Sequence, residues 1–501
     1  MKSPFEKCAA RMKEISSLSQ VFALLHWDED TMMPERGIDS RAEQAEALSG
    51  IIHEKIVSRS LGESLRALSA DSSKLSEGER VCVREWLRDH DRSVKLPEKL
   101  VRELSSTATL SRKAWMEASR ASDFAIFAPW LGKTVELKRR QAECLGYSGV
   151  PYDALLDDYE PHMTVAELDP IMENLRAGLV PLVAAIADSG VKNDLRALSL
   201  RYPAEKQEIV AREVMSAMGV DSTASRLDRS AHPFCSGISP TDVRITTRYN
   251  EKLFTSSLYG VIHESGHALY ELGLPGEHAR TPLAEAVSLG IHESQSRFWE
   301  NVVGRSLPFV SWMMPKLKKL FPRQLRGIGA ASFYRAINAV RPTSIRVEAD
   351  EVTYNLHVVL RYEIEKALIS GEAEVSGLPS LWNDKMREYL GIEPEDDASG
   401  VLQDIHWPSG LFGYFPTYSL GNLYSAQWWH RIRRDVSGVD KMIARGDFKP
   451  ILSWLRSNIH SQGRRYPASE LVVKATGRPL DAGHFICYLN EKYGDIYGVR
   501  M

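Results

Sequence analysis

The segment VIHESGHALYE, residues 261–271, constrains this chain more than any other stretch. An α-helix turns once every ~3.6 residues, so His263 and His267 project from one helix face about one turn apart. Two imidazoles in this arrangement can bind one metal ion, and the adjacent Glu264 can accept a proton from a water molecule at that ion. The alternative is a solvated helix that holds two histidines by chance. The pattern favours a metal hydrolase site on a helix.

A catalytic zinc ion commonly has three protein ligands and one open position, so a further ligand is needed. The segment 283–301 has helical periodicity, and Glu285 and Glu293 are its candidate ligands. Glu293 is preferred because the polar Ser294 and Gln295 beside it can orient a ligand. Glu285 is the alternative, and it can also be read as a charge in the first turn of a helix.

Helical periodicity covers most of the chain, with apolar residues three and four apart, as in residues 98–120. The same periodicity occurs in residues 4–20, 38–67, 75–91, 133–145, 165–188, 204–218, 356–370 and 436–458. The exception is TDVRITTRYNE, residues 241–251, whose alternating β-branched residues predict a strand. Its two-residue spacing places Asp242, Arg244 and Thr246 on one face, along a possible substrate cleft.

Composition excludes several classes of protein. The 501 residues carry a formal net charge of -3, with 63 Lys and Arg against 66 Asp and Glu, so no basic footprint for nucleic acid is present. The apolar run 178–187 contains a proline and is about half the ~20 residues that a membrane span requires. The N-terminus lacks the apolar core of a signal peptide. Five scattered cysteines without a C-x-x-C pair indicate a reducing cytoplasm rather than a disulfide framework.

Six short motifs occur along the chain in a fixed order. They are HPF (232–234), DVRIT (242–246), HESGH (263–267), HESQ (292–295), IRVEAD (345–350) and GVLQDIHW (400–407). This set resembles the carboxypeptidase Taq family of metallocarboxypeptidases. The resemblance extends through WDEDTMMP (27–34), YDALLDDYEP (152–161) and FGYFPTY (412–418), and so covers nearly the whole chain.

The resemblance implies a mainly α fold, with one large helical catalytic domain, a deep central groove and a small β-sheet next to the metal site. Length alone would allow about three domains. With the resemblance we expect one unit over residues 1–501, with a helical part at about 1–200 and a metal-site part at about 230–420. A homodimer is also implied.

The same resemblance assigns His263, His267 and Glu293 as metal ligands and Glu264 as the general base. It implies Zn²⁺ or Co²⁺, one ion per chain. The expected reaction is the removal of single residues from peptides with a free C-terminus, with nucleic acid and membranes excluded as partners. Two rivals remain: an endopeptidase with the same metal, and a helical binding protein without activity.

The remaining roles are open to alternatives. An oxyanion needs hydrogen-bond donors, and His406 followed twelve residues later by Tyr418 resembles other helical zinc peptidases, such as the thimet oligopeptidases. Tyr414 is the alternative donor, and the whole Gly, Tyr, Phe, Pro run is also typical of a tightly packed loop.

A terminal carboxylate is best held by the bidentate fork of an arginine. Arg346 is the first candidate, followed by Arg244, with Asp242 beside it, and by Arg248. The alternative is structural: Arg244 would pair with Asp242, and Arg346 with Asp350, to brace the groove.

Overall fold

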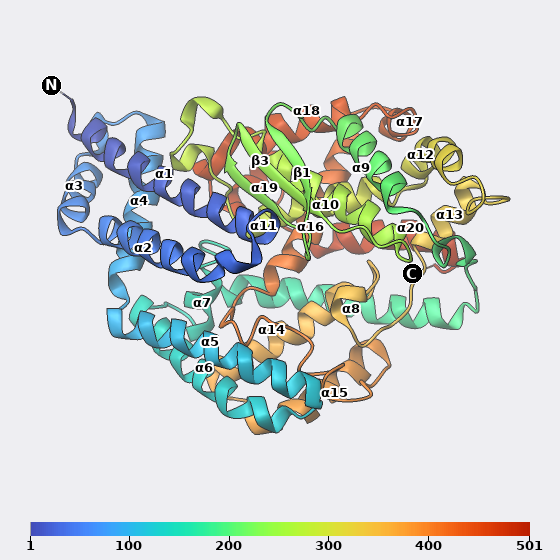
Figure 1. The fold of residues 1–501 in the computed structure, drawn as a ribbon, viewed down its shortest axis with the longest axis horizontal. Coiled ribbons are helices and arrows are strands. Elements are labelled where there is room, and N and C mark those ends of the chain that lie inside the picture. The colour runs from blue at the N-terminus through green and yellow to red at the C-terminus, as the bar shows by residue number, and fades with distance from the viewer. Residues whose placement is uncertain (1, 501) are drawn as a thin grey trace.

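Helices dominate the computed structural model, which describes residues 2–500 and is 69% helical with one small sheet of three strands. This confirms the mainly α fold predicted from the sequence. Figure 1 shows α1 and α2 beside the sheet, with α5, α6, α14 and α15 gathered on the opposite side of the molecule.

The first part of the chain is helical throughout. Its helices are α1 (Pro4–Thr31), α2 (Ile38–Ile56), α3 (Arg59–Ala70), α4 (Glu77–Lys95), α5 (Glu98–Ala121), α6 (Phe124–Leu145), α7 (Pro151–Leu156), α8 (Val165–Asp188) and α9 (Ala204–Met218). The strands follow as β1 (Ser225–Arg229), β2 (Cys235–Ser239) and β3 (Asp242–Thr247).

The second part begins with the helix of the HESGH motif. It contains α10 (Phe254–Glu271), α11 (Leu289–Arg297), the π-helical turn η6 (Phe298–Gly304), α12 (Leu307–Leu320), α13 (Ala330–Ile337), α14 (Tyr354–Ser370) and α15 (Leu378–Leu390). The last helices are α16 (Pro416–Asp435), α17 (Val439–Ile443), α18 (Lys449–Asn458), α19 (Ala468–Thr476) and α20 (Ala482–Tyr497).

Most predicted segments match single helices, but two are divided. The segment 38–67 is interrupted at Ser58, whose backbone is extended, so α2 and α3 are separate. The segment 436–458 is divided between α17 and α18 at Gly446, whose φ of 76° lies in the left-handed region that glycine adopts without steric cost. Apolar spacing continued through both breaks, which is why periodicity alone did not reveal them.

The sheet lies between α1 and α10. Its strand order is β1-β3-β2, with β1 parallel and β2 antiparallel to β3. Val243 and Ile245 of β3 are fully buried in the main core, which also contains apolar residues of α10. Trp27 near the end of α1 is buried, and its ring is covered by the guanidinium groups of Arg226 and Arg244. Trp27 of the WDEDTMMP motif thus packs against side chains of β1 and β3.

Two glycines allow three helices to approach closely around the HESGH motif. A Cβ atom at Gly266 of α10 would lie 2.6 Å from the carbonyl oxygen of Gln295 in α11. A Cβ atom at Gly421 of α16 would lie 2.5 Å from Cγ of Glu293. Any larger residue at either position would push α11 away, so these contacts fix Glu293 beside α10.

Hydrophobic residues form one large core cluster that runs from Ala118 to Tyr497 and a smaller one among α1, α3 and α4. Helix α8 is long and apolar enough, by length and composition, to cross a membrane. Its Leu168, Leu175 and Leu179 side chains are fully buried in the large cluster, where α8 packs against α20 and α14. Core packing therefore accounts for the apolar residues on one face of α8.

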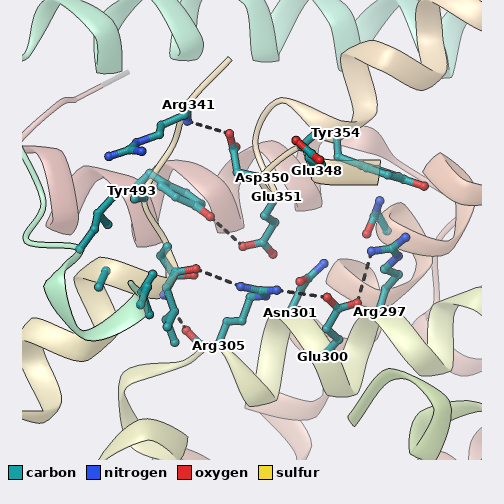
Figure 2. A pocket seen from close by; sticks show the side chains of 18 residues that line it. Arg297, Glu300, Asn301, Arg305, Arg341, Glu348, Asp350, Glu351, Tyr354 and Tyr493 are labelled. Carbon is teal, nitrogen blue, oxygen red and sulfur yellow. Dashed lines mark hydrogen bonds and ion pairs between the residues drawn. The ribbon is translucent and has the colours of Figure 1, made fainter. Parts of the chain in front are cut away.

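A polar cavity of about 280 Å³ lies between η6, the segment 336–354 and α20 (Figure 2). Its walls include Arg297, Glu300 and Arg305 on one side and Asp350 and Glu351 on another. Charged groups of both signs therefore face the same cavity.

Glu160 of the YDALLDDYEP motif holds the start of α11. Its fully buried carboxylate accepts hydrogen bonds from the Ser288 hydroxyl (2.9 Å), the Gly290 amide (3.0 Å) and the Tyr424 hydroxyl (3.3 Å). Burial raises the pKa of Glu160 to about 7, although these three donors oppose the shift. The folded state therefore holds this proton more tightly than the unfolded chain does.

The raised pKa of Glu160 predicts a pH-dependent contribution to stability. The contribution is fully present below the unfolded pKa of about 4.3 and is lost as pH rises to about 7. Relative to Glu160→Gln, wild type should lose up to about 3 kcal/mol of unfolding free energy over this range. Denaturant unfolding with a chelator present measures the difference, with the exposed Glu173→Gln on α8 as control. A wild-type minus variant difference that does not change with pH would contradict the prediction.

Candidate metal centre

Helix α10 presents its two histidines on the face opposite its apolar stripe. Val261, Ile262 and Leu269 are fully buried in the core at helical spacing. His263 and His267 project from the other side toward α11, with side-chain exposures of 19% and 14%. The prediction that His263 and His267 share one face of a helix is therefore confirmed.

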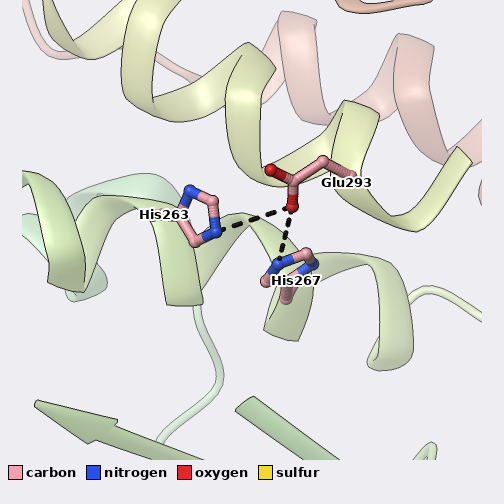
Figure 3. Close-up of side chains that lie close together, drawn as sticks. All are labelled: His263, His267 and Glu293. Atoms are coloured by element: carbon pink, nitrogen blue, oxygen red, sulfur yellow. Dashed lines mark ion pairs between the residues drawn. The ribbon is translucent and has the colours of Figure 1, made fainter. Parts of the chain in front are cut away.

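The structure brings His263, His267 and Glu293 together (Figure 3). One Glu293 oxygen, Oε2, lies 3.6 Å from Nε2 of His263 and 3.4 Å from Nε2 of His267. The three donor atoms lie within 4.8 Å of one another. Within the described part of the chain, this is the one cluster of three or more such residues with metal-binding spacing.

These donors fit a divalent transition metal. Tetrahedral bonds of ~2.0–2.1 Å to nitrogen and oxygen place neighbouring donor atoms roughly 3.3 Å apart, close to the separations observed. Two imidazole nitrogens and one carboxylate oxygen also leave one coordination position for water or substrate, as catalytic sites require.

The charges around the cluster are unusually concentrated. Burial alone would lower the pKa of His263, but the carboxylates of Glu293 and Glu300 raise it to about 9. Burial and the nearby His292 lower the pKa of His267 to about 3. Burial raises the pKa of Glu264 to about 7, with His263 opposing. The carboxylates of Glu264, Glu293 and Glu300 thus lie around the two imidazoles.

The alternative third ligand lies elsewhere. Glu285 is partly exposed and pairs with Arg464 at 3.1 Å. It follows the short turn Pro282–Ala284 in extended backbone and is not in the first turn of a helix. Only Glu293 of the two candidates therefore joins the histidines.

His406 and Tyr418 lie together beside the metal cluster. Nε2 of His406 is 3.2 Å from the Tyr418 hydroxyl. Tyr418 is three residues before Gly421, the position on α16 that touches Glu293. Tyr414 packs edge-on against Tyr418, with ring centroids 5.3 Å apart, so the two candidate donors are neighbours. Burial lowers the pKa of His406 to about 4, so its imidazole is neutral at pH 7.

Arg346 is buried and does not pair with Asp350. Its Nη2 donates to Asp404 at 2.7 Å and its Nη1 to the Tyr354 hydroxyl at 2.9 Å. Arg361 also donates to Asp404, at 2.6 Å. The predicted alternative pair, Arg346 with Asp350, is wrong, because Asp350 accepts backbone amides of its own loop instead. Two buried arginines share one aspartate, which leaves one net positive charge.

Asp242 and Arg244 pair with each other. The guanidinium donates from Nε at 2.5 Å and from Nη2 at 2.9 Å to the two carboxylate oxygens, and it also covers the ring of Trp27. This is the structural alternative that the sequence had left open. Arg248, the third arginine considered, is exposed and donates to the Ala231 carbonyl at 3.3 Å. Over residues 2–500, no ion pair or hydrogen bond links Asp242 or Arg244 to His263, His267 or Glu293.

Sequence reasoning missed four charged residues around the site. Arg297 and Glu300 contact Glu293 and His263, and they follow Glu293 by four and seven residues, a same-face helical spacing that could have revealed them. Asp404 lies within the GVLQDIHW motif, which could have singled it out. Arg361 carried no local signal, because its partner is distant in sequence.

Known proteins share this architecture along its whole length. The family model described as carboxypeptidase Taq (M32) metallopeptidase matches residues 7–493. Thermostable carboxypeptidase 1 of Thermus thermophilus is 44% identical over 498 residues, covering 97% of each chain. Carboxypeptidase 1 of Bacillus subtilis is 40% identical over 486 residues, also covering 97% of each. The crystal structure of an M32 carboxypeptidase from Deinococcus radiodurans R1 has a TM-score of 0.97 at 36% identity, covering 99% of this chain and 100% of that one.

Two histidines and a glutamate that converge from neighbouring helices, together with these relatives, place the chain among the metal-dependent peptide hydrolases. The chain belongs to the carboxypeptidase Taq (M32) family of metallopeptidases. It is thus a metallocarboxypeptidase that requires a divalent metal and acts on peptides.

The cluster predicts which carboxylate governs metal uptake. Glu293→Ala should lower the zinc content of the purified protein, because one of three donors is lost, whereas Glu285→Ala should not. Elemental analysis after chelation and reloading with Zn²⁺ or Co²⁺ measures this, and reloading should restore activity in wild type. Reduced metal content in Glu285→Ala alone would move the third ligand to that residue.

Proposed function

We propose that this metallocarboxypeptidase removes single residues from the free C-terminus of peptides, with Zn²⁺ or Co²⁺ held by His263, His267 and Glu293. The observation that carries the proposal is the pairing of two features. A three-donor cluster lies beside Glu264, and a buried Arg346, Asp404 and Arg361 group with net positive charge lies nearby. A bound divalent ion acts as a Lewis acid toward the scissile carbonyl and toward water.

Glu264 is the general base in this proposal. It is buried beside His263, and its pKa of about 7 in the metal-free chain suits a group that both accepts and returns a proton near neutral pH. The carboxylate takes a proton from the attacking water and delivers it to the leaving amine. Of the two predicted ligands on α10, His263 is followed directly by an acid, Glu264, whereas His267 is followed by Ala268.

Tyr418 is the proposed donor to the oxyanion, with His406 holding its hydroxyl. The neutral imidazole of His406, with its proton on Nε2, donates to the Tyr418 hydroxyl oxygen 3.2 Å away and leaves the hydroxyl proton for the oxyanion. A donor that is already oriented stabilises developing negative charge without reorganisation. Tyr414 packs against Tyr418 and keeps the ring in place.

The terminal carboxylate is the proposed partner of Arg346. Asp404 is shared with Arg361, so it neutralises only one of two buried positive charges. Burial of an uncompensated charge is costly, and the carboxylate of a bound peptide supplies the missing negative charge. Arg346 is preferred over Arg244 for this reason, because Asp242 already compensates Arg244.

An endopeptidase is the rival within the same chemistry. It would use the same metal and base but would have no need for an uncompensated buried arginine.

We further propose that residues 1–501 form one catalytic unit around a central groove, that the protein is a homodimer in the cytoplasm, and that neither nucleic acid nor a membrane is its partner. The core from Ala118 to Tyr497 supports one unit over that part of the chain, and Leu283 joins the smaller N-terminal cluster of α1, α3 and α4 to the later part.

Glu264→Gln tests the general base. The isosteric amide cannot accept the proton, so turnover should fall by about two to four powers of ten while zinc content and the circular dichroism spectrum stay at wild-type levels. Steady-state kinetics on a short peptide measure the loss. Near-wild-type turnover in the metal-loaded variant would rule out this role.

The carboxylate receptor is tested with matched peptides that end in a free acid or an amide. Wild type should prefer the acid by about ten- to a hundredfold in kcat/KM, because a charge-assisted hydrogen bond is lost with the amide. Arg346→Met should abolish the preference mainly through KM, whereas Arg244→Met should retain it. Internal cleavage as the first event, or equal rates on both peptides in wild type, would favour the endopeptidase.

A further inference from the structure

Two of the three proposed metal ligands are hydrogen-bonded, at the side-chain atom that points away from the cluster, by residues of one stretch of helix. His263 turns Nε2 toward the cluster, and its Nδ1 donates to Oε2 of Glu300 at 2.9 Å. Glu293 turns Oε2 toward the cluster, and its Oε1 accepts from Nε of Arg297 at 2.6 Å. Arg297 is the last residue of α11, and Glu300 lies in the π-helical turn η6 that follows.

One stretch of helix, α11 and the π-helical turn η6 that follows it, reaches both ligands. Glu293, Arg297 and Glu300 are spaced by four and three residues, so they line one face of α11 and η6. Segments of π-helix are rare and are enriched at functional sites. Gly304 ends the turn, and a Cβ atom there would lie 2.8 Å from the carbonyl oxygen of Trp299. The backbone departs from α-helical geometry at the turn that carries Glu300.

Glu300 is itself fixed by two arginines. Its Oε2 accepts from Nη1 of Arg297 at 3.3 Å, and its Oε1 accepts from Nη2 of Arg305 at 3.3 Å. Arg305 is anchored in turn by the Ile337 carbonyl at 2.9 Å and by the ring of Tyr259, whose centroid is 3.9 Å from the guanidinium carbon. The carboxylate therefore has little freedom to leave His263.

His267 is held differently. In the described chain its buried Nδ1 has no hydrogen-bond partner. Its ring instead stacks on His292, with centroids 4.4 Å apart and planes 27° apart. His292 is fixed by Glu271 through a contact of 2.8 Å at Nε2. One histidine is thus oriented by a carboxylate and the other by stacking.

We propose that Glu300, supported by Arg297 and Arg305, is a positioning residue for the metal centre. It fixes the proton of His263 on Nδ1, directs Nε2 to the metal position and increases the basicity of that nitrogen. A carboxylate behind a ligating imidazole typically contributes 10- to 100-fold in metal affinity. The inference rests on the ligand set proposed above and adds a residue outside that set.

The test compares zinc affinity in full-length variants, by competition with a chelator of known affinity. Glu300→Gln should bind Zn²⁺ about 10- to 100-fold more weakly than wild type. Glu300→Asp keeps the charge but withdraws the carboxylate by one methylene, so it should also bind more weakly. With Co²⁺ as a probe, the visible spectrum of both variants should differ from that of wild type, because the His263 ring is no longer held in one orientation.

Glu351→Gln is the matched control. Glu351 is a buried carboxylate in the wall of the same cavity (Figure 2), but it bonds to Lys492 at 2.6 Å and to Tyr488 at 2.9 Å and touches no proposed ligand. Its loss should lower the melting temperature of the metal-free protein and leave zinc affinity unchanged. A merely structural role for Glu300 would give the same result as this control.

The outcomes separate this inference from the proposed function. Equal zinc affinities of wild type and Glu300→Gln, with one ion bound by each, would contradict the inference alone. Wild-type affinity in Glu300→Asp together with weak binding by Glu300→Gln would also contradict it, since charge and not the contact would then matter. Failure of wild type to bind zinc at all would remove the proposed ligand set and this inference together.

Discussion

The close approach of α10, α11 and α16 is the constraint on which the site depends. Side chains reach only a few ångströms, so two histidines on α10 and a glutamate on α11 can share one ion only if the helices nearly touch. Gly266 and Gly421 permit this, because any Cβ atom there would overlap α11. Glu160 adds a second restraint by holding the first turn of α11 through Ser288 and Gly290. The position of Glu293 is thus set by packing and capping.

Charge compensation then determines what each part of the site can do. Glu293 and Glu300 are balanced by Arg297 and Arg305, so these carboxylates remain ionised although they are buried. Burial would raise the pKa of Glu300, yet Arg297 and His263 lower it to about 2. Around Asp404 the balance is different, because Arg346 and Arg361 supply two charges against one. The arginines keep Glu293 and Glu300 ionised, and the incomplete balance around Asp404 suits a place where an anionic group binds.

Sequence reasoning recovered the helical class, a strand predicted over residues 241–251 that the structure limits to Asp242–Thr247, and the residues that converge as the metal cluster. The helices, the strand and the histidine pair rest on local spacing, which a helix or strand converts directly into geometry, whereas Glu293 was preferred for its polar neighbours and assigned by the family resemblance. It left open the pairing of Arg346, because Asp404 lies in a different motif 58 residues away and periodicity carries no information on such contacts. It also gave no sign of the π-helical turn, since nothing in the apolar pattern of FWENVVG distinguishes i+5 from i+4 bonding.

The metal cluster and the Arg346 group come from separate stretches of chain, and Tyr354 and α16 connect them. The Tyr354 ring stacks under Arg297, whose guanidinium carbon is 4.7 Å from its centroid, while the Tyr354 hydroxyl accepts from Arg346. Tyr418 on α16 packs edge-on against Tyr354, and Gly421 on the same helix abuts Glu293. A displacement of α16 would therefore alter the distance between the metal position and Arg346. Packing through Tyr354, Tyr418 and α16 is therefore what fixes the spacing of the metal cluster and the Arg346 group.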